Sequence, residues 1–167
     1  IASAEQVMTG VFGMGEEFVL WFALVAGGLA GANFVNSRLV QRVGMRRLSH
    51  GALVGFTLVS AFAYIAMAAL GPVFPVFFPL FMLAFAFFGM MGSNFNALAM
   101  EPLGEIAGTA SAAYGFATTT LAGLIGGVIG RAYDGTVLPI LAGFTVLGLV
   151  SLFIVLMTEK GRLFGST

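Results

Sequence analysis

The sequence predicts an all-α polytopic membrane protein with five transmembrane helices. Hydrophobic residues make up 59% of its 167 residues, and charged residues only 8%. Water-soluble domains carry about 25% charged residues, so this chain has too little polar surface to cover a soluble core of its size. The apolar runs are continuous rather than alternating, which predicts helices rather than the strands of a barrel.

The number of helices follows from the thickness of a bilayer. A hydrocarbon core of about 30 Å needs roughly 20 mostly apolar helical residues to cross it. Five stretches of the chain meet this requirement. They are 18–36, 51–70, 79–100, 108–130 and 138–157.

The first three predicted helices end at polar or helix-breaking residues. The first ends at a basic loop over 36–50, which contains four arginines. The second ends at Gly71-Pro72, and the third at Glu101-Pro102. Proline cannot donate a backbone hydrogen bond, so both dipeptides favour a break between helices.

The last two predicted helices are separated by a polar turn. The fourth ends at Arg131, and the turn contains Asp134. Thr136 is predicted to cap the fifth helix, and Pro139 lies in its first turn, where a missing N–H costs nothing. A polar tail over 158–167 follows.

The arginines predict which side of the membrane each loop faces, because cytoplasmic loops carry an excess of Lys and Arg. Loop 36–50 holds four arginines and the tail adds Lys160 and Arg162, whereas the other side holds only Arg131. Six positive charges against one predict that this loop, the 101–108 loop and the C-terminus are cytoplasmic. The expected location is the cell inner (plasma) membrane, crossed several times.

Composition excludes several kinds of site. The chain has one His and no Cys, which excludes disulfides, thiol catalysis and cysteine metal sites. It contains no metal-ligand spacing, nucleophile–base pair or phosphate-binding loop, and its net charge of zero gives no attraction for nucleic acid. We therefore expect no enzyme activity, catalytic residue, cofactor or metal, and we expect the lipid bilayer as a partner.

Two predicted helices carry small residues at four-residue spacing: Gly27 and Gly31 in the first, and Gly123 and Gly127 in the fourth. Small residues let helix backbones approach closely in lipid, where packing must drive association. The fifth helix is bulky, as suits contact with lipid. We therefore expect the first and fourth helices to make close helix contacts, some of them with parts outside this chain.

The arginine-rich segment resembles a known motif. It follows a glycine-rich membrane helix and is similar to the second copy of the loop motif G-x-x-x-D-R-x-G-x-R-R of the major facilitator superfamily. Ser37 and Gln41 stand where the motif has its glycine and its aspartate. The matching residues are Arg42, Gly44, Arg46 and Arg47.

A second stretch, from Asn96 to Gly115, resembles the region of the tenth and eleventh helices in bacterial drug:proton antiporters of the bicyclomycin-resistance-like group. The resemblance implies that the five helices are the eighth to twelfth of a twelve-helix transporter, so that the chain is a truncated C-terminal half-bundle. Residues 1–17 would then be the extracytoplasmic end of a preceding helix and a loop.

The implied function is transmembrane transport of small molecules by alternating access, with proton-coupled drug efflux as the first choice. A sugar or metabolite symporter of the same superfamily is the alternative. A non-transporting membrane scaffold or assembly factor is the alternative from another class. The implied partners are the missing N-terminal half of the same transporter, a small-molecule substrate and protons, with no nucleic acid.

The resemblance assigns the third predicted helix to the wall of a central cavity. Phe81, Phe85 and Phe88 share one face of this helix, where they either pack against lipid and helices or form an aromatic wall for flat substrates. Asn94 either hydrogen-bonds a neighbouring helix or contacts substrate. Tyr114 of the fourth helix is the remaining candidate for the cavity.

Ionisable groups lie at helix ends rather than helix centres, so the chain shows no obvious proton relay. Glu101 is either a solvated helix-end charge or, as the resemblance implies, the acid that pairs with Arg42 or Arg46 and latches the inner gate in the outward-facing state. We interpret His50 as a solvated or headgroup-contacting side chain rather than a pH sensor. The predicted gating motif is Arg42, Gly44, Arg46, Arg47 and Glu101.

Overall fold

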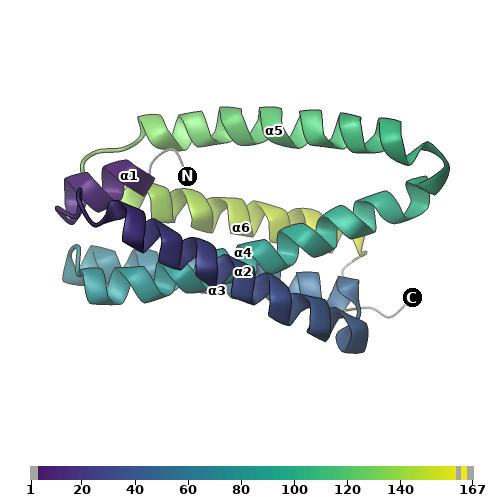
Figure 1. The fold of residues 1–167 in the computed structure, drawn as a ribbon, viewed down its shortest axis with the longest axis horizontal. Coiled ribbons are helices and arrows are strands. Elements are labelled where there is room, and N and C mark those ends of the chain that lie inside the picture. The colour runs from purple at the N-terminus through teal and green to yellow at the C-terminus, as the bar shows by residue number, and fades with distance from the viewer. Residues whose placement is uncertain (1–3, 161–162, 165–167) are drawn as a thin grey trace.

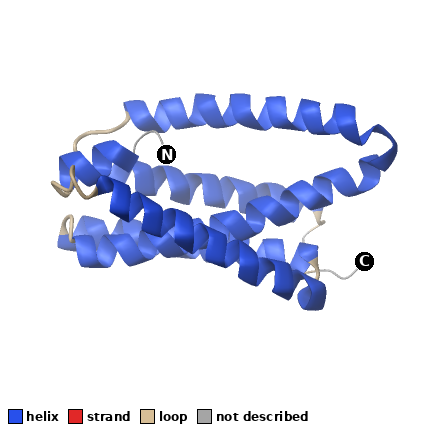
Figure 2. Cartoon of the chain, in the orientation of Figure 1, coloured by secondary structure: helices blue, strands red, loops and turns tan. Residues whose placement is uncertain are grey.

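The computed structural model describes residues 4–160 and 163–164, and every regular element in this part of the chain is a helix (Figures 1 and 2). The all-helical prediction is therefore confirmed for these residues. The long helices are α2 (Phe18–Val43), α3 (Met45–Leu70), α4 (Phe74–Met100), α5 (Ala107–Arg131) and α6 (Leu138–Thr158). The short elements are α1 (Ala4–Gln6), the π-helical turn η1 (Val7–Val11) and the 3-10 helix η2 (Glu101–Ile106).

The long helices have the length and composition that a bilayer requires. Four stretches qualify when α4 and α5 are taken as one helical run over Phe74–Arg131. The backbone of Leu103 leaves helical geometry (φ −108°, ψ 19°) inside η2, and α4 and α5 run on different sides of the molecule from this point (Figure 1). The described chain therefore contains four to five helices able to span a membrane, as expected of a membrane protein.

The predicted loop over 36–50 is wrong. Both sides of this segment are helical, and Gly44 alone separates α2 from α3. Its φ of +87° suits glycine, which has no Cβ to clash in this region. Arg42 lies in the last turn of α2 and Arg46 in the first turn of α3. The prediction failed because arginine is a good helix former, and its long side chain reaches water from a helix end.

Two further boundaries differ from the prediction. Helix α4 begins at Phe74 rather than at 79, because Pro75 is accommodated at its start and Pro79 lies inside the helix. Thr136 is not the residue that caps α6, since Val137 occupies that position. The Thr136 hydroxyl still accepts a hydrogen bond from the backbone N–H of Leu138, at 3.2 Å.

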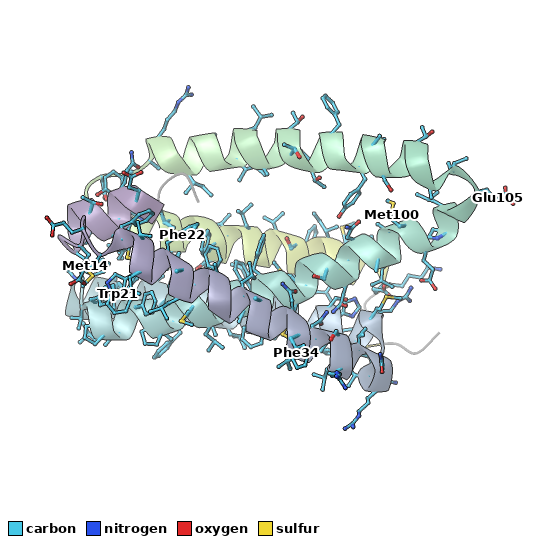
Figure 3. The ribbon with its side chains drawn as sticks, in the orientation of Figure 1. Met14, Trp21, Phe22, Phe34, Met100 and Glu105 are labelled. Atoms are coloured by element: carbon cyan, nitrogen blue, oxygen red, sulfur yellow. The ribbon has the colours of Figure 1, made fainter. Side chains whose placement is uncertain are left out.

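The core lies between α3, α4 and α6, and α2 packs across α4 (Figure 1). At the end where α2 begins, Trp21 stacks edge-on against Phe74 and Phe78 of α4, with ring centroids 4.8 Å apart in both pairs. Figure 3 shows Trp21 and Met14 at this end of the molecule and Glu105 at the opposite end. The aromatic packing fixes how α2 and α4 meet.

The two ends of the chain are tied to this bundle in different ways. Residues 1–17 were expected to be the end of a preceding helix plus a loop; 1–3 lie outside the described residues, and Val7 and Met8 of η1 are buried in the core. At the other terminus, Arg162, which the sidedness prediction counts as cytoplasmic, lies outside the described residues. Lys160, the tail's other positive charge, directly follows Glu159 after α6.

Helix α5 stands apart from the rest. It runs along one side of the bundle (Figure 1), and none of its residues is buried. Helix α2 buries only Val25 and Asn36. Of the two helices expected to make close contacts, α2 makes them with α4, where a Cβ built at Gly28 would lie 2.8 Å from the Met82 side chain, and α5 makes few within the described chain.

Candidate functional site

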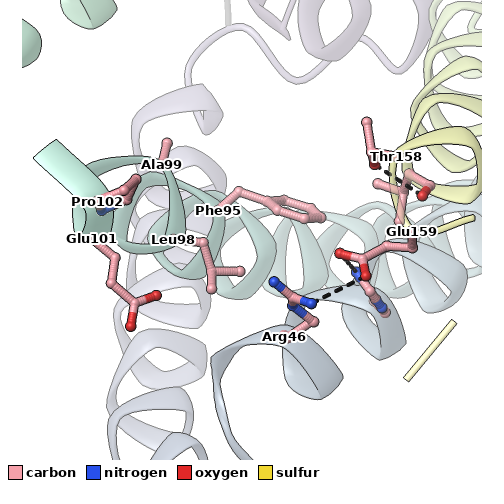
Figure 4. Close-up of a pocket in the computed structure, with 10 residues that line it drawn as sticks. Arg46, Phe95, Leu98, Ala99, Glu101, Pro102, Thr158 and Glu159 are labelled. Atoms are coloured by element: carbon pink, nitrogen blue, oxygen red, sulfur yellow. Dashed lines mark hydrogen bonds and ion pairs between the residues drawn. The ribbon is translucent and has the colours of Figure 1, made fainter. Parts of the chain in front are cut away.

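A pocket of about 700 Å³ opens where α3 begins and α4 and α6 end (Figure 4). We call this end of the bundle the arginine end. The pocket wall is mostly apolar, with Phe95 and Leu98 of α4 and Val155 of α6. Its ionisable side chains are Arg46, His50, Glu101 and Glu159.

An ion pair joins α3 to the end of α6 across this pocket. Arg46 Nη1 donates to Glu159 Oε2 at 3.2 Å, and the side chains are 39% and 22% exposed. A pair this open to water contributes about 0–1 kcal/mol. The ion pair therefore contributes more to helix alignment than to stability, because it fixes which turn of α3 the end of α6 contacts.

The expected partner of the arginines was Glu101. Among the described residues, the acid that pairs with Arg46 is Glu159, and Glu101 makes no ion pair. Figure 4 shows Arg46 between Glu101 and Glu159 on the wall of the same pocket. The sequence missed Glu159 because it lies 113 residues from Arg46 and was placed in a solvated tail.

His50 is buried rather than solvated, which corrects the sequence interpretation. Only 2% of its side chain is exposed. Its Nδ1 accepts a hydrogen bond from the backbone N–H of Phe164 at 3.2 Å, and its Nε2 lies 4.0 Å from Glu159 Oε1. The cause is the early start of α3, which places His50 in the second turn of a helix under the segment that follows α6.

Asn94 forms a hydrogen-bonded pair with Asn36 of α2. Asn94 Nδ2 donates to Asn36 Oδ1 at 2.8 Å, and Asn36 Nδ2 donates to Asn94 Oδ1 at 3.2 Å. Both side chains are buried. Of the two interpretations of Asn94, this geometry favours the contact between helices over a contact with substrate.

The phenylalanines of α4 pack among helices. Phe81 is buried and lies 4.6 Å, centroid to centroid, from Phe85, which lies 6.2 Å from Phe88. Phe144 of α6 packs on both Phe81 and Phe85, at 6.3 and 6.0 Å. This arrangement matches the helix-packing interpretation, while Phe88 is 51% exposed.

The remaining cavity candidate, Tyr114, lies on α5 away from this aromatic group. Its carbonyl accepts a hydrogen bond from Thr118 of the same helix, at 2.8 Å. Neither the pocket at the arginine end nor the apolar groove between α5 and α6 is lined by Tyr114, Asn94 or these phenylalanines.

The four glycines predicted to pack against other helices have no close neighbour on the described chain. A Cβ built at Gly27, Gly31, Gly123 or Gly127 would meet no atom within 4 Å. Helix α5 instead turns bulky residues toward α6, where Val128 and Ile129 line an apolar groove with Gly143. The small and bulky sides of α5 thus have different surroundings.

Asp134 organises the turn between α5 and α6. Its Oδ1 accepts hydrogen bonds from the Thr136 hydroxyl at 2.6 Å and from the Thr136 backbone N–H at 3.0 Å. The hydroxyl contact is the main reason that the pKa of the Asp134 carboxyl is lowered from its usual value. This carboxylate therefore has a structural role in the turn.

The chain was also compared with known proteins. No protein-family model, curated protein or solved structure matches it.

Proposed function

We propose that this chain is the C-terminal part of a secondary transporter of the major facilitator type, working by alternating access. The observation that carries the proposal is the open small-residue side of α5. A helix of 25 residues with none of them buried has most of its packing surface free for neighbours outside this bundle. Two bundles that rock against each other require such helices at their interface.

The sequence of α5 supports this assignment. Gly108, Ala112, Gly115, Thr119 and Gly126 recur at alternating spacings of four, three, four and seven residues, which places them on one side of a helix. Small residues at such spacing are typical of helices that approach one another closely in lipid. Nothing lies within 4 Å of a Cβ built at Gly108, Gly115 or Gly126.

The arginine end supports a gate with two arrangements. Arg46 pairs with Glu159 in this structure, and Glu101 lies on the wall of the same pocket. Two acids near one arginine allow the ion pair to be exchanged when α4 moves relative to α6. We propose that Glu101 takes the place of Glu159 in the outward-facing state.

Within this class, proton-coupled export of small apolar drugs is the proposed activity. The ionisable side chains of the described helices lie near helix ends, so the proton-carrying group would belong to the other half of the transporter. A metabolite symporter and a non-transporting scaffold are the competing outcomes of the test.

The test begins with the reading frame that contains this chain. It should add about seven hydrophobic segments and a second copy of the arginine motif upstream. Expressed in cells that lack their own efflux pumps, the full protein should lower ethidium accumulation, and a protonophore should abolish the effect. Arg46→Gln should impair efflux more than the matched variant Arg46→Lys, which keeps the charge.

The outcomes separate the alternatives. Uptake of a sugar or metabolite in place of dye efflux would favour the symporter. A reading frame that starts at Ile1, with no movement of any solute, would favour the scaffold. The 167-residue chain alone in proteoliposomes should move no dye, because it has no second bundle to rock against.

A further inference from the structure

Glu159 and Phe164, which follow α6, contact the first turns of α3. We call the described residues 159–160 and 163–164 the strap. Besides the ion pair of Glu159 with Arg46, Arg47 Nε donates to the carbonyl oxygen of Phe164 at 3.2 Å. The backbone N–H of Phe164 donates to His50 Nδ1 at the same distance. At Phe164, the far end of the strap, both the backbone N–H and the backbone carbonyl are therefore hydrogen-bonded to α3.

The hydrogen bond to His50 fixes the protonation state of its ring. Nδ1 accepts a hydrogen bond, so it carries a lone pair and no proton. The neutral ring then has its proton on Nε2, which lies 4.0 Å from Glu159 Oε1. The Phe164 ring packs against the imidazole edge-on, with centroids 6.0 Å apart. The strap therefore binds the neutral form of His50.

We propose that protonation of His50 releases the far end of the strap from α3. The second proton comes from water and binds Nδ1, which turns the acceptor into a donor. Two N–H donors then face each other at Phe164, and their hydrogen bond is lost. Imidazole is the side chain that takes up a proton near neutral pH, so the strap responds to acidification at the arginine end.

The surrounding charges make the release partial. Glu159 attracts the protonated ring and Arg46 repels it, so Glu159 is shared between two cations and the near end of the strap stays in place. The far end loses its hydrogen bond to His50 and is then held by the exposed contact with Arg47 and the edge-on contact of the Phe164 ring. The charged groups on the elements packed around His50 are Arg46 and Arg47 of α3, Glu159 and Lys160 of the strap, and Glu101 of η2.

The proposal does not depend on transport, and a distance measurement tests it. The chain has no Cys, so spin labels can be placed selectively at Leu163→Cys in the strap and at Gln41→Cys on the exposed end of α2. Pulsed electron double resonance in lipid nanodiscs then reports their separation. At about pH 8 the distribution should be narrow, and at about pH 5 roughly half or more of the narrow population should be lost.

Two variants in the labelled background make the result specific. His50→Gln does not titrate and presents an amide oxygen to the strap, so its distribution should not change with pH. Phe164→Pro removes the donor N–H, the ring contact with His50 and the positive φ of residue 164 together, so it should give the broad distribution at both pH values. The proposal is overturned if the unmodified His50 chain shows no pH response, if it is broad already at pH 8, or if Phe164→Pro responds to pH as the parent does.

Discussion

The buried pair Asn36–Asn94 makes the strength of a helix contact in this bundle measurable. Replacing Asn94 by Leu removes both reciprocal hydrogen bonds between α2 and α4, which are 2.8 and 3.2 Å long. It also leaves the buried amide of Asn36 without its partner. We therefore expect Asn94→Leu to cost more than the two hydrogen bonds alone, about 1–3 kcal/mol.

The interaction free energy between the two asparagines is obtained from a double-mutant cycle with Asn36→Leu. Hydrogen bonds between membrane helices average about 0.6 kcal/mol each, so two of them predict a coupling of about 1.2 kcal/mol. That corresponds to roughly an eightfold change in the unfolding equilibrium constant. The double variant should be more stable than the sum of the single losses implies, because neither amide is then left buried alone.

The assay is reversible unfolding of the chain in mixed micelles, followed by the fluorescence of its single tryptophan, Trp21 of α2. The matched control is the exposed contact between Ser93 and Asn33, which joins the same two helices at 3.1 Å. Ser93→Ala should change stability by no more than about 0.5 kcal/mol. Additive losses for the Asn36 and Asn94 variants, within about 0.3 kcal/mol, would refute the reasoning.

Three further predictions concern the contact between α3 and α6, the glycine between α2 and α3, and the turn between α5 and α6. Gly148→Ala should destabilise the chain by about 1–3 kcal/mol in the same assay, because the added Cβ would collide with the side chain of Thr57 and push α6 from α3. Gly44→Ala should cost about 1–3 kcal/mol, because its φ of +87° and ψ of 151° are favourable only for glycine. Acidification should weaken the turn at Asp134: the lowered pKa of this carboxyl means that its contribution is present above the usual value near 3.9 and is lost as the pH falls below it. Unfolding measured from pH 6 to pH 2 follows this loss.

Each of these predictions has a control in the same chain. Gly127→Ala adds a methyl group on open surface and should leave stability unchanged or slightly raised, since alanine favours helix. Gly104→Ala tests a glycine in a link where φ is not positive and no atom is close. Asp134→Asn should remove the contribution of this carboxyl to the pH dependence of stability, while the pH dependence that other groups cause remains. Equal losses at Gly148 and Gly127 would contradict the packing argument.

The sequence predicts the helices well and their ends less well, and the difference has a physical cause. Burial in lipid requires long apolar runs, so the spans are visible in composition alone. The ends depend on how polar residues behave at the membrane surface. The arginines at 38–47 were interpreted as a loop because they are charged, yet they continue α2 and begin α3 on either side of Gly44. Charge marks the membrane surface in this segment and does not mark the end of a helix.

The candidate site was less predictable, because its contacts join distant parts of the chain. Arg42 or Arg46 was predicted to pair with Glu101, whereas the acid that pairs with Arg46 in this structure is Glu159, 113 residues away. His50 lies next to arginines in sequence, which suggested exposure, yet Phe164 is its hydrogen-bond partner across 114 residues. A single sequence gives the chemistry of each side chain and does not specify which of several similar groups it meets.

Helix α5 is a second case in which the sequence indicates the kind of contact but does not specify the partner. Small residues predicted that other helices approach this helix closely, some of them from parts outside this chain. Bulky residues such as Ile129 face α6, where they meet Gly143, and the glycines at 108, 115 and 126 face nothing. A helix that used its small side within its own bundle would leave only bulky surface to the outside, as α6 does with Leu149 and Phe153. Bulky residues of α5 are exposed as well, Phe116, Leu124 and Val128 at 64–75%, so the property that favours an interface helix is the uncovered row of small residues at close-packing spacing, and we place the second bundle of the proposed transporter against that row.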